Sequence, residues 1–253
     1  MENYVPWLQV RDLPKTSSVY RVKGWKTRRE HHLTKLQYAY FLLAEWSDKV
    51  VDIREQYPML PIERAQAIAE EIGMEYPVDP DSQMPLVITT DFLLTVEDEG
   101  GRYEIARSLV DRKELEKTAV VQRLELTRRF WQAQGVPWDL VTDTRLPGTM
   151  IRNVQHVHAA FHLEGTERYT VSELASLIPD LGRYLRDAKG TIKDALEEME
   201  RALNLEPGTA NYLLTHLVAR KQVVVDMREP LDITKPASVI KHIVENEEDM
   251  RVR

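Results

Sequence analysis

The chain has 253 residues, 43% of them hydrophobic and 30% charged, a balance typical of a globular protein with room for one large domain or two ordinary ones. It contains no cysteine, which excludes disulfides, thiolate zinc sites and cysteine nucleophiles. With a formal net charge of −7 and a pI near 5.6, the chain is not expected to coat nucleic acid through general electrostatics, so any DNA contact should be local or assisted by a partner.

Membrane and secretion signals are missing from the sequence. No run of about 18 apolar residues could form a membrane span, and Met1–Trp7 has neither the basic start nor the apolar segment of a signal peptide. We therefore expect a cytoplasmic protein with no membrane partner. The close histidine pairs, His31-His32 and His156-x-His158, lack metal-site spacing with a carboxylate neighbour and are expected to be core or surface residues.

The first half of the chain alternates predicted helices and strands. No regular element is predicted over 1–32, which has no sustained period. Apolar residues recur at helical spacing over 33–46, and β-branched residues predict a strand over 49–57. A helix over 61–71 has a proline in its first turn.

Residues 86–96 and 102–110 are predicted to form a β-hairpin, because the polar loop between them contains two glycines. The first run is apolar at both odd and even positions, as expected of a strand buried on both faces, and Asp91 is its single acid. Two structural explanations for this acid are an ion pair with Arg107, which should lie about opposite, and a strand-end cap. The third is a metal-dependent nuclease centre.

A nuclease centre at such a hairpin requires a second metal ligand and a lysine two residues apart on the neighbouring strand, because residues i and i+2 point to the same side. Residues 102–110 contain no acid followed by lysine at this spacing. Their one carboxylate, Glu104, is expected opposite Leu94, roughly 10 Å from Asp91 at ~3.3 Å per residue. The framework fits a nuclease, but its chemistry is incomplete.

Two domains are predicted from the pattern of elements. A long helix over 115–134 and a strand over 137–142 complete an α/β domain, residues 1–147, in which helices flank a mixed sheet. Residues 148–253 are mostly helical in pattern and favour a winged-helix domain. Its helices are predicted over 149–160, 170–178 behind the capping-box pattern Thr170-x-x-Glu173, 181–188, 191–203 and 207–219, and its wing over 222–226 and 231–233.

Several short segments together resemble the TnsA family, in the same order and with similar gaps over residues 4–145. They are Tyr4–Leu8, His31–Leu33, Val51–Pro58, Thr90–Leu93 and Arg123–Trp131. The resemblance implies a restriction-endonuclease-like first domain and a winged-helix second domain. It also implies a place in a heteromeric transposase, in which TnsA relatives cut the 5′ ends of the transposon and TnsB cuts and joins the 3′ ends. Expected partners are transposon-end DNA, a TnsB-like transposase and a TnsC-like ATPase engaged by the second domain.

The catalytic positions of the family can be transferred one at a time. The family glutamate on the first long helix falls on Gln37, and the family aspartate falls on Asp91, which is retained. The Gln-x-Lys element of the next strand falls on Ser108 and Val110. Glutamine supplies no anionic oxygen to a hard divalent ion, and valine cannot stabilise phosphorane charge. We therefore expect a nuclease-fold subunit without cleavage activity and without a bound metal, although active relatives use Mg²⁺.

The opposing hypothesis is a working endonuclease with an altered site. Such a site would combine Asp91 with Glu104 or Glu55 as the second acid, and with Arg107 or Lys113 as the cation.

A third hypothesis is a host DNA-binding regulator that uses only the winged helix. Its recognition helix, 207–219, would offer Asn211, Tyr212, Thr215 and His216, with no arginine before Arg220, so a protein-binding surface is favoured over major-groove readout.

Local DNA contact is predicted for a basic stretch near the N-terminus that includes Trp25. A solvated basic loop is an equally good interpretation of this stretch. The candidate DNA-binding residues are Arg21, Lys23, Lys26, Arg28 and Arg29.

Overall fold

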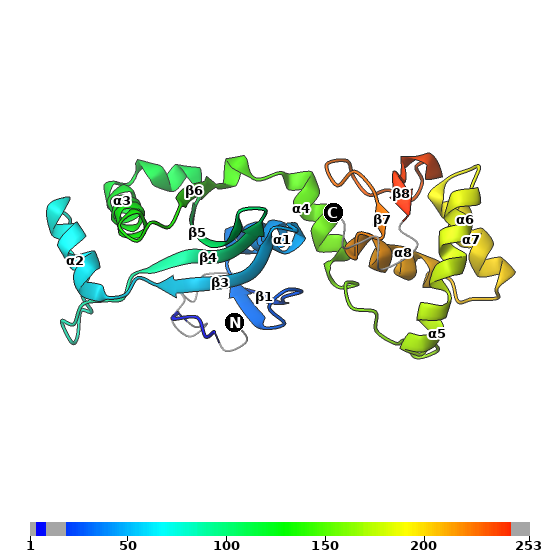
Figure 1. Cartoon of the computed structure of the whole chain (residues 1–253), viewed down its shortest axis with the longest axis horizontal. Helices are drawn as coiled ribbons and strands as arrows, with labels where there is room; N and C mark the ends of the chain where they lie inside the picture. Colours follow the sequence, from blue (N-terminus) through cyan, green and yellow to red (C-terminus); the bar gives the residue numbers. More distant parts are fainter. Residues whose placement is uncertain (1–3, 9–18, 244–253) are drawn as a thin grey trace. The chain divides into compact units, whose positions relative to one another are not determined.

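The computed structural model describes residues 4–8 and 19–243 (Figure 1). Backbone contacts divide the chain into two compact units, Met1–Leu146 and Pro147–Arg253, which are described separately. Within the described residues, no helix is both long enough and apolar enough to cross a bilayer.

A four-stranded mixed sheet forms the centre of the first unit, as predicted. Its strand order is β3-β4-β5-β6, with antiparallel pairing from β3 to β5 and parallel pairing between β5 and β6. The predicted hairpin is β4 and β5, closed at Asp98 and Gly101. The strands are β3 (Val50–Pro58), β4 (Thr89–Asp98), β5 (Gly101–Val110) and β6 (Trp138–Thr142).

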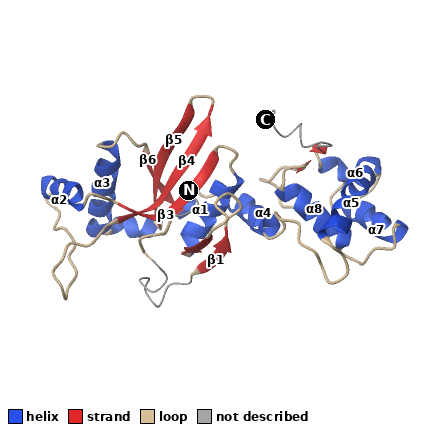
Figure 2. Cartoon of the chain, turned by 60° about the horizontal axis from the view of Figure 1, so that its bottom comes forward, coloured by secondary structure: helices blue, strands red, loops and turns tan. Residues whose placement is uncertain are grey.

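Helices cover both faces of this sheet (Figure 2). On one face, α1 (Lys35–Trp46) packs Phe41 and Ala44 in a core with Phe92 of β4. On the other face, α2 (Ile62–Glu71) and α3 (Thr118–Gln132) pack around Leu93 of the same strand. Strand β4 is therefore buried on both faces, which explains its apolar residues at both parities. Two short 3₁₀ helices, η2 (Arg112–Glu116) and η3 (Asp143–Arg145), follow β5 and β6.

The prediction that no regular element lies within 1–32 is wrong for its last part. Strands β1 (Tyr20–Lys23) and β2 (Glu30–Leu33) pair as an antiparallel hairpin. Each strand has only four residues, too few for a two-residue period to stand out, and the turn between them is closed by the Gly24 N–H donating to the Arg29 carbonyl. Contacts with β3, about 24 residues further along the chain, hold the hairpin in place: His31 contacts Glu55, and Arg29 donates to the Ile53 carbonyl.

The second unit is mostly helical, as predicted. The capping box predicted at Thr170 is confirmed, since its hydroxyl accepts from the Glu173 N–H and the Glu173 carboxylate accepts from the Thr170 N–H. Leucines of α6, α7 and α8 supply much of the buried surface of this unit. The helices are α4 (Gly148–His158), α5 (Val171–Ser176), α6 (Ile178–Asp187), α7 (Ile192–Ala202), α8 (Thr209–Ala219) and the 3₁₀ helix η4 (Ala237–Val239).

The predicted wing is wrong in its second strand. Strand β7 (Val223–Val224) pairs with β8 (His242–Ile243), not with residues 231–233. The backbone of 231–233 bonds to helices instead, with the Leu231 N–H donating to the Asn153 side chain and the Ile233 carbonyl accepting from the Lys193 N–H. A pairing that skips 17 residues leaves no short-range hairpin signal in the sequence.

Candidate functional site

Asp91 lies where two central strands separate. The β4–β5 ladder runs from Asp98 opposite Gly101 to Phe92 opposite Arg107, and Asp91 comes next on β4. There the Leu109 N–H of β5 donates to Asp91 Oδ2 at 2.8 Å. A side-chain carboxylate thus accepts the hydrogen bond that a backbone carbonyl would accept in a continued ladder. Asp91 therefore fastens β4 to β5 at the end of their pairing.

Gln37 of α1 meets the other carboxylate oxygen. The side chain of Gln37 is buried, and its Nε2 donates to Asp91 Oδ1 at 2.7 Å. Its Oε1 accepts from the Thr34 N–H at 3.0 Å, in the capping box that starts α1. The amide orientation is fixed by this chain of bonds, because Oε1 must face the N–H donor and Nε2 must face the carboxylate. The structure thus joins two residues 54 positions apart that the family resemblance assigns to one centre.

Ser108 and Val110 lie on β5 on either side of Leu109. The Ser108 hydroxyl accepts from the Trp138 indole N–H at 3.1 Å, so it serves the packing of β5 against β6. Val110 is buried and brings no polar group. These two positions therefore contribute no charge to the surroundings of Asp91.

Burial raises the pKa of the Asp91 carboxyl above its ordinary value. The hydrogen bonds from Leu109 and Gln37 and the charge of Arg123 on α3 act in the opposite direction, but desolvation is the larger effect. The ionised carboxylate therefore costs stability at neutral pH. Because the folded pKa lies above the unfolded one, this cost falls away as the pH drops through the raised value.

The surroundings of Asp91 do not fit a divalent metal ion. Magnesium prefers six oxygen ligands in octahedral geometry, whereas the groups that face the Asp91 oxygens are N–H donors of Gln37 and Leu109, which cannot coordinate a cation. Among residues 4–8 and 19–243, no group of three histidines, aspartates and glutamates is placed to hold a metal. The two N–H donors and the apolar Val110 suit a carboxylate that acts as a structural acceptor.

The second acids of the altered-site hypothesis are engaged elsewhere. Glu104 lies opposite Thr95, one residue further from Asp91 than expected, and forms an ion pair with Arg54 of β3. Glu55, also on β3, is 1% exposed and contacts His31 Nδ1 at 2.8 Å.

The candidate cations of that hypothesis are placed as follows. Arg107 lies opposite Phe92 and donates to the Ala106 carbonyl at 2.8 Å, so the proposed Asp91–Arg107 ion pair is not the arrangement found. Lys113 lies in η2, after the end of β5.

The basic stretch near the N-terminus divides into two groups. Lys26 Nζ donates to the carbonyls of Ser47 and Val50 at 2.7 and 2.6 Å, and Arg29 donates to the Ile53 carbonyl at 2.6 Å. These two side chains thus hold the hairpin against the sheet. The other three side chains, those of Arg21, Lys23 and Arg28, are exposed. Arg21 forms an ion pair with Glu30.

Helix α8 contains the candidates of the recognition-helix hypothesis, and its side chains serve mainly the second unit. The His216 Nδ1 lies 2.7 Å from the Ala160 carbonyl, and burial lowers the pKa of its imidazole. The Thr215 hydroxyl donates to the Asn211 carbonyl, and the Tyr212 hydroxyl accepts from the Glu164 N–H. Such a helix offers few free groups to base edges.

Sequence reasoning missed two contributors to the Asp91 site. The Leu109 N–H is a backbone group, and it is available to Asp91 only because the pairing of β4 with β5 ends there. The charge of Arg123 acts on Asp91 only because the tertiary fold places α3 near β4. One signal was available, because Thr34-x-x-Gln37 is a capping-box pattern and predicts the bond between the Thr34 N–H and Gln37.

The Gln37–Asp91 hydrogen bond contributes to the stability of the first unit. We expect Gln37→Glu to lower the free energy of unfolding at pH 7 by about 2–4 kcal/mol, because it replaces a buried donor with a second carboxylate against Asp91. The loss should shrink at lower pH, where one carboxyl can carry a proton, and on adding Mn²⁺, which two carboxylates can chelate. Urea unfolding with EDTA or Mn²⁺ measures both effects.

The matched control is Gln132→Glu, which makes the same change on an exposed residue of α3 beside Arg128. It should leave stability within about 0.5 kcal/mol of wild type. Equal stability of Gln37→Glu and wild type in EDTA would contradict the hydrogen-bond assignment.

Comparisons with known proteins match both units of the chain to the same family. A family model described as TnsA-like endonuclease N terminal matches residues 47–143, and one described as TnsA endonuclease C terminal matches residues 146–227. The chain is 31% identical over 253 residues to the transposon Tn7 transposition protein TnsA of Escherichia coli, an alignment that covers 99% of this chain and 89% of that relative. The similarity extends into the second unit, where the sequence motifs alone indicate a common architecture.

Proposed function

We propose, from the premise that this chain belongs to the TnsA endonuclease family, that it is a subunit of a DNA transposition machine which binds transposon ends and partner proteins without cutting DNA. The observation that carries the proposal is the hydrogen bond from Gln37 to Asp91. It places an amide N–H, which cannot coordinate a cation, against the carboxylate, at the position where active relatives carry a glutamate. The family position thus has a structural use in this chain.

The chemistry of the replaced positions supports loss of cleavage. Gln37 offers no anionic oxygen, and Val110 cannot stabilise the charge that develops on phosphorus. Removing a single acid–base or charge-stabilising group costs on the order of 10²–10⁴ in rate. Several such losses at one centre leave an activity too low to free the 5′ ends of a transposon.

Binding to transposon-end DNA rests on a small cationic surface. Of the basic stretch, Arg21, Lys23 and Arg28 remain exposed, and the chain as a whole carries a net charge of −7. Counterion release by so few cations gives weak binding at physiological salt. The chain therefore reaches DNA together with a TnsB-like transposase or a TnsC-like ATPase.

The second unit is the proposed contact for the ATPase partner. Helices α6, α7 and α8 with the β7–β8 pair support a winged-helix-like arrangement. An apolar cavity of about 160 Å³ in this unit is bordered by Asp226, Glu229 and Asp232. Lys235 also lines the cavity and pairs with Glu229, and Lys241 pairs with Asp226, so the cavity suits chiefly an apolar side chain of a partner segment.

The test is a transposition assay in which this chain is the sole TnsA protein, with a plasmid donor and partner proteins supplied. Without 5′ cleavage the donor stays joined to the transposon, so cointegrates should dominate over simple insertions. Asp91→Ala should give the same product ratio as wild type. A majority of simple insertions that disappears with Asp91→Ala would favour the altered-site endonuclease instead.

A further inference from the structure

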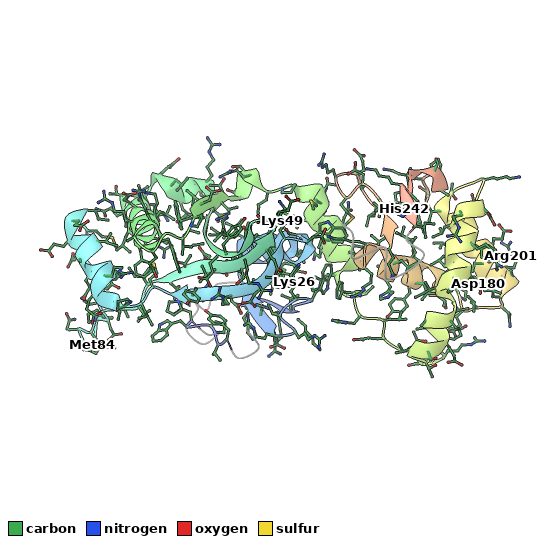
Figure 3. The ribbon with its side chains drawn as sticks, in the orientation of Figure 1. Lys26, Lys49, Met84, Asp180, Arg201 and His242 are labelled. Carbon is green, nitrogen blue, oxygen red and sulfur yellow. The ribbon has the colours of Figure 1, made fainter. Side chains whose placement is uncertain are left out.

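A small two-stranded ribbon joins α2 to β4 in the first unit. Val78 and Pro85 form an isolated bridge, and the ribbon is closed by the Asp79 N–H donating to the Met84 carbonyl and the Leu86 N–H donating to the Pro77 carbonyl. Met84, labelled in Figure 3, lies on this ribbon beside the start of α2 and away from the middle of the sheet. None of the positions assigned to the nuclease centre lies in this segment.

Met84 and Leu86 lie two residues apart on this ribbon and share one face, whereas Val78, bridged to Pro85, lies on the opposite face. Met84 is 65% exposed, and Val78 and Leu86 are each 43% exposed. Leu60 follows Met59, whose N–H donates to the Ile88 carbonyl, and is 47% exposed. These four are among eleven exposed large apolar side chains in the described residues. Met84 and Leu86, two large apolar side chains exposed on one face, are the anchors that a protein contact would use.

The ribbon has a defined shape. Asp79 Oδ1 accepts from the Ser82 N–H and hydroxyl, both at 2.8 Å, and these bonds lower the pKa of the Asp79 carboxyl. The Tyr76 hydroxyl donates to the Leu86 carbonyl at 2.9 Å. The turn therefore presents Met84 and Leu86 in a fixed arrangement, which reduces the ordering cost of binding.

Charge narrows the class of partner. Residues 73–88 contain Glu75, Asp79 and Asp81 and no lysine, arginine or histidine. This composition disfavours contact with DNA phosphates or with an anionic membrane. It favours a protein surface with an apolar recess and a rim of Lys and Arg.

We propose that residues 77–86 dock into a cation-rimmed apolar recess of the DNA-binding transposase that works with this chain, an inference that rests on the proposed function. Proteins that hold DNA concentrate Lys and Arg on their surfaces, which complements the acidic ribbon. A second copy of this chain, with a net charge of −7, matches the ribbon less well. The ribbon also belongs to the unit that contains Asp91.

The experiment measures binding of the purified full-length chain to the purified transposase without DNA. Met84→Ser with Leu86→Ser should weaken binding by about tenfold or more, because two apolar anchors are lost. Asp81→Lys should weaken it too, with the difference shrinking at high salt. The control Val171→Ser removes an apolar side chain of α5 that is 47% exposed, between Leu86 and Met84, and should bind like wild type.

The outcomes separate the two proposals. The double variant Met84→Ser, Leu86→Ser and the control Val171→Ser should unfold thermally at the same midpoint as wild type, because the altered side chains are largely on the surface. If the wild type fails to bind the transposase, the partner assignment of the proposed function is overturned. If the wild type binds and the ribbon variants bind equally well, only the docking proposal fails. The docking proposal would also be overturned if the ribbon variants bound the transposase like wild type but lost self-association or ATPase binding.

Discussion

The triple variant Gln37→Glu, Ser108→Gln, Val110→Lys should gain Mg²⁺- or Mn²⁺-dependent nicking of a transposon-end substrate in the presence of the transposase, whereas the wild-type chain gives none. The three changes rebuild the family's carboxylate, amide and lysine around Asp91. No single change should suffice, because groups that act as one unit contribute non-additively. Nicking of labelled end DNA on a denaturing gel measures the gain.

The structure shows where this rescue is at risk. A glutamine at position 108 can still accept from the Trp138 indole, but Val110→Lys places an ammonium at a buried position. That cost is several kcal/mol unless Asp91 or a bound phosphate offsets it. The control is the triple variant with Asp91→Ala, which should lose the gained activity. Wild-type nicking that vanishes with Asp91→Ala alone would contradict the inactive-site proposal.

Glu55→Ala should lower the free energy of unfolding by about 3–5 kcal/mol, the range for removing one partner of a buried charge contact. Glu55 of β3 is almost fully buried, and its Oε2 lies 2.8 Å from His31 Nδ1 and 3.7 Å from the Arg29 guanidinium. The change leaves the Arg29 charge, only 13% exposed at its side chain, without its nearest carboxylate. Urea unfolding measures the loss.

Glu97→Ala is the matched control for this change. Glu97 pairs with Arg102 at 2.7 Å, but both side chains are at least half exposed, so the loss should stay below about 1 kcal/mol. Equal losses in the two variants would show that burial does not set the value of the Glu55 contact.

Sequence periodicity predicted the elements of the sheet well and the N-terminal hairpin poorly. Helix α1 has apolar residues at helical spacing, and the β4–β5 hairpin has a continuous apolar run followed by a two-glycine loop; the structure contains both within a few residues of the predicted bounds. Strand β2 is too short for such a signal, and its two histidines lie on opposite sides, with His31 fully buried against Glu55. Whether a segment as short as β2 forms a strand depends on contacts with residues distant in sequence, such as that of His31 with Glu55.

The site was predictable only in part, for a related reason. The family motifs predicted that Gln37 and Asp91 belong to one centre, and the structure shows that Gln37 donates a hydrogen bond to Asp91. The charge pattern of the basic stretch could not distinguish Lys26 and Arg29, which bind backbone carbonyls, from Lys23 and Arg28, which are exposed. Whether a basic side chain is exposed or binds the backbone depends on which carbonyl groups the fold places within hydrogen-bonding distance of it.

The bond chain from Thr34 through Gln37 to Asp91 also bears on how such a protein can evolve. Each donor along it faces an acceptor, so the amide at position 37 satisfies both the start of α1 and the buried carboxylate. A lineage that regained glutamate there by one mutation would first lose stability, before any lysine at position 110 could make the carboxylate useful. If cleavage is absent as we propose, the single change Gln37→Glu therefore lowers stability before it can restore activity.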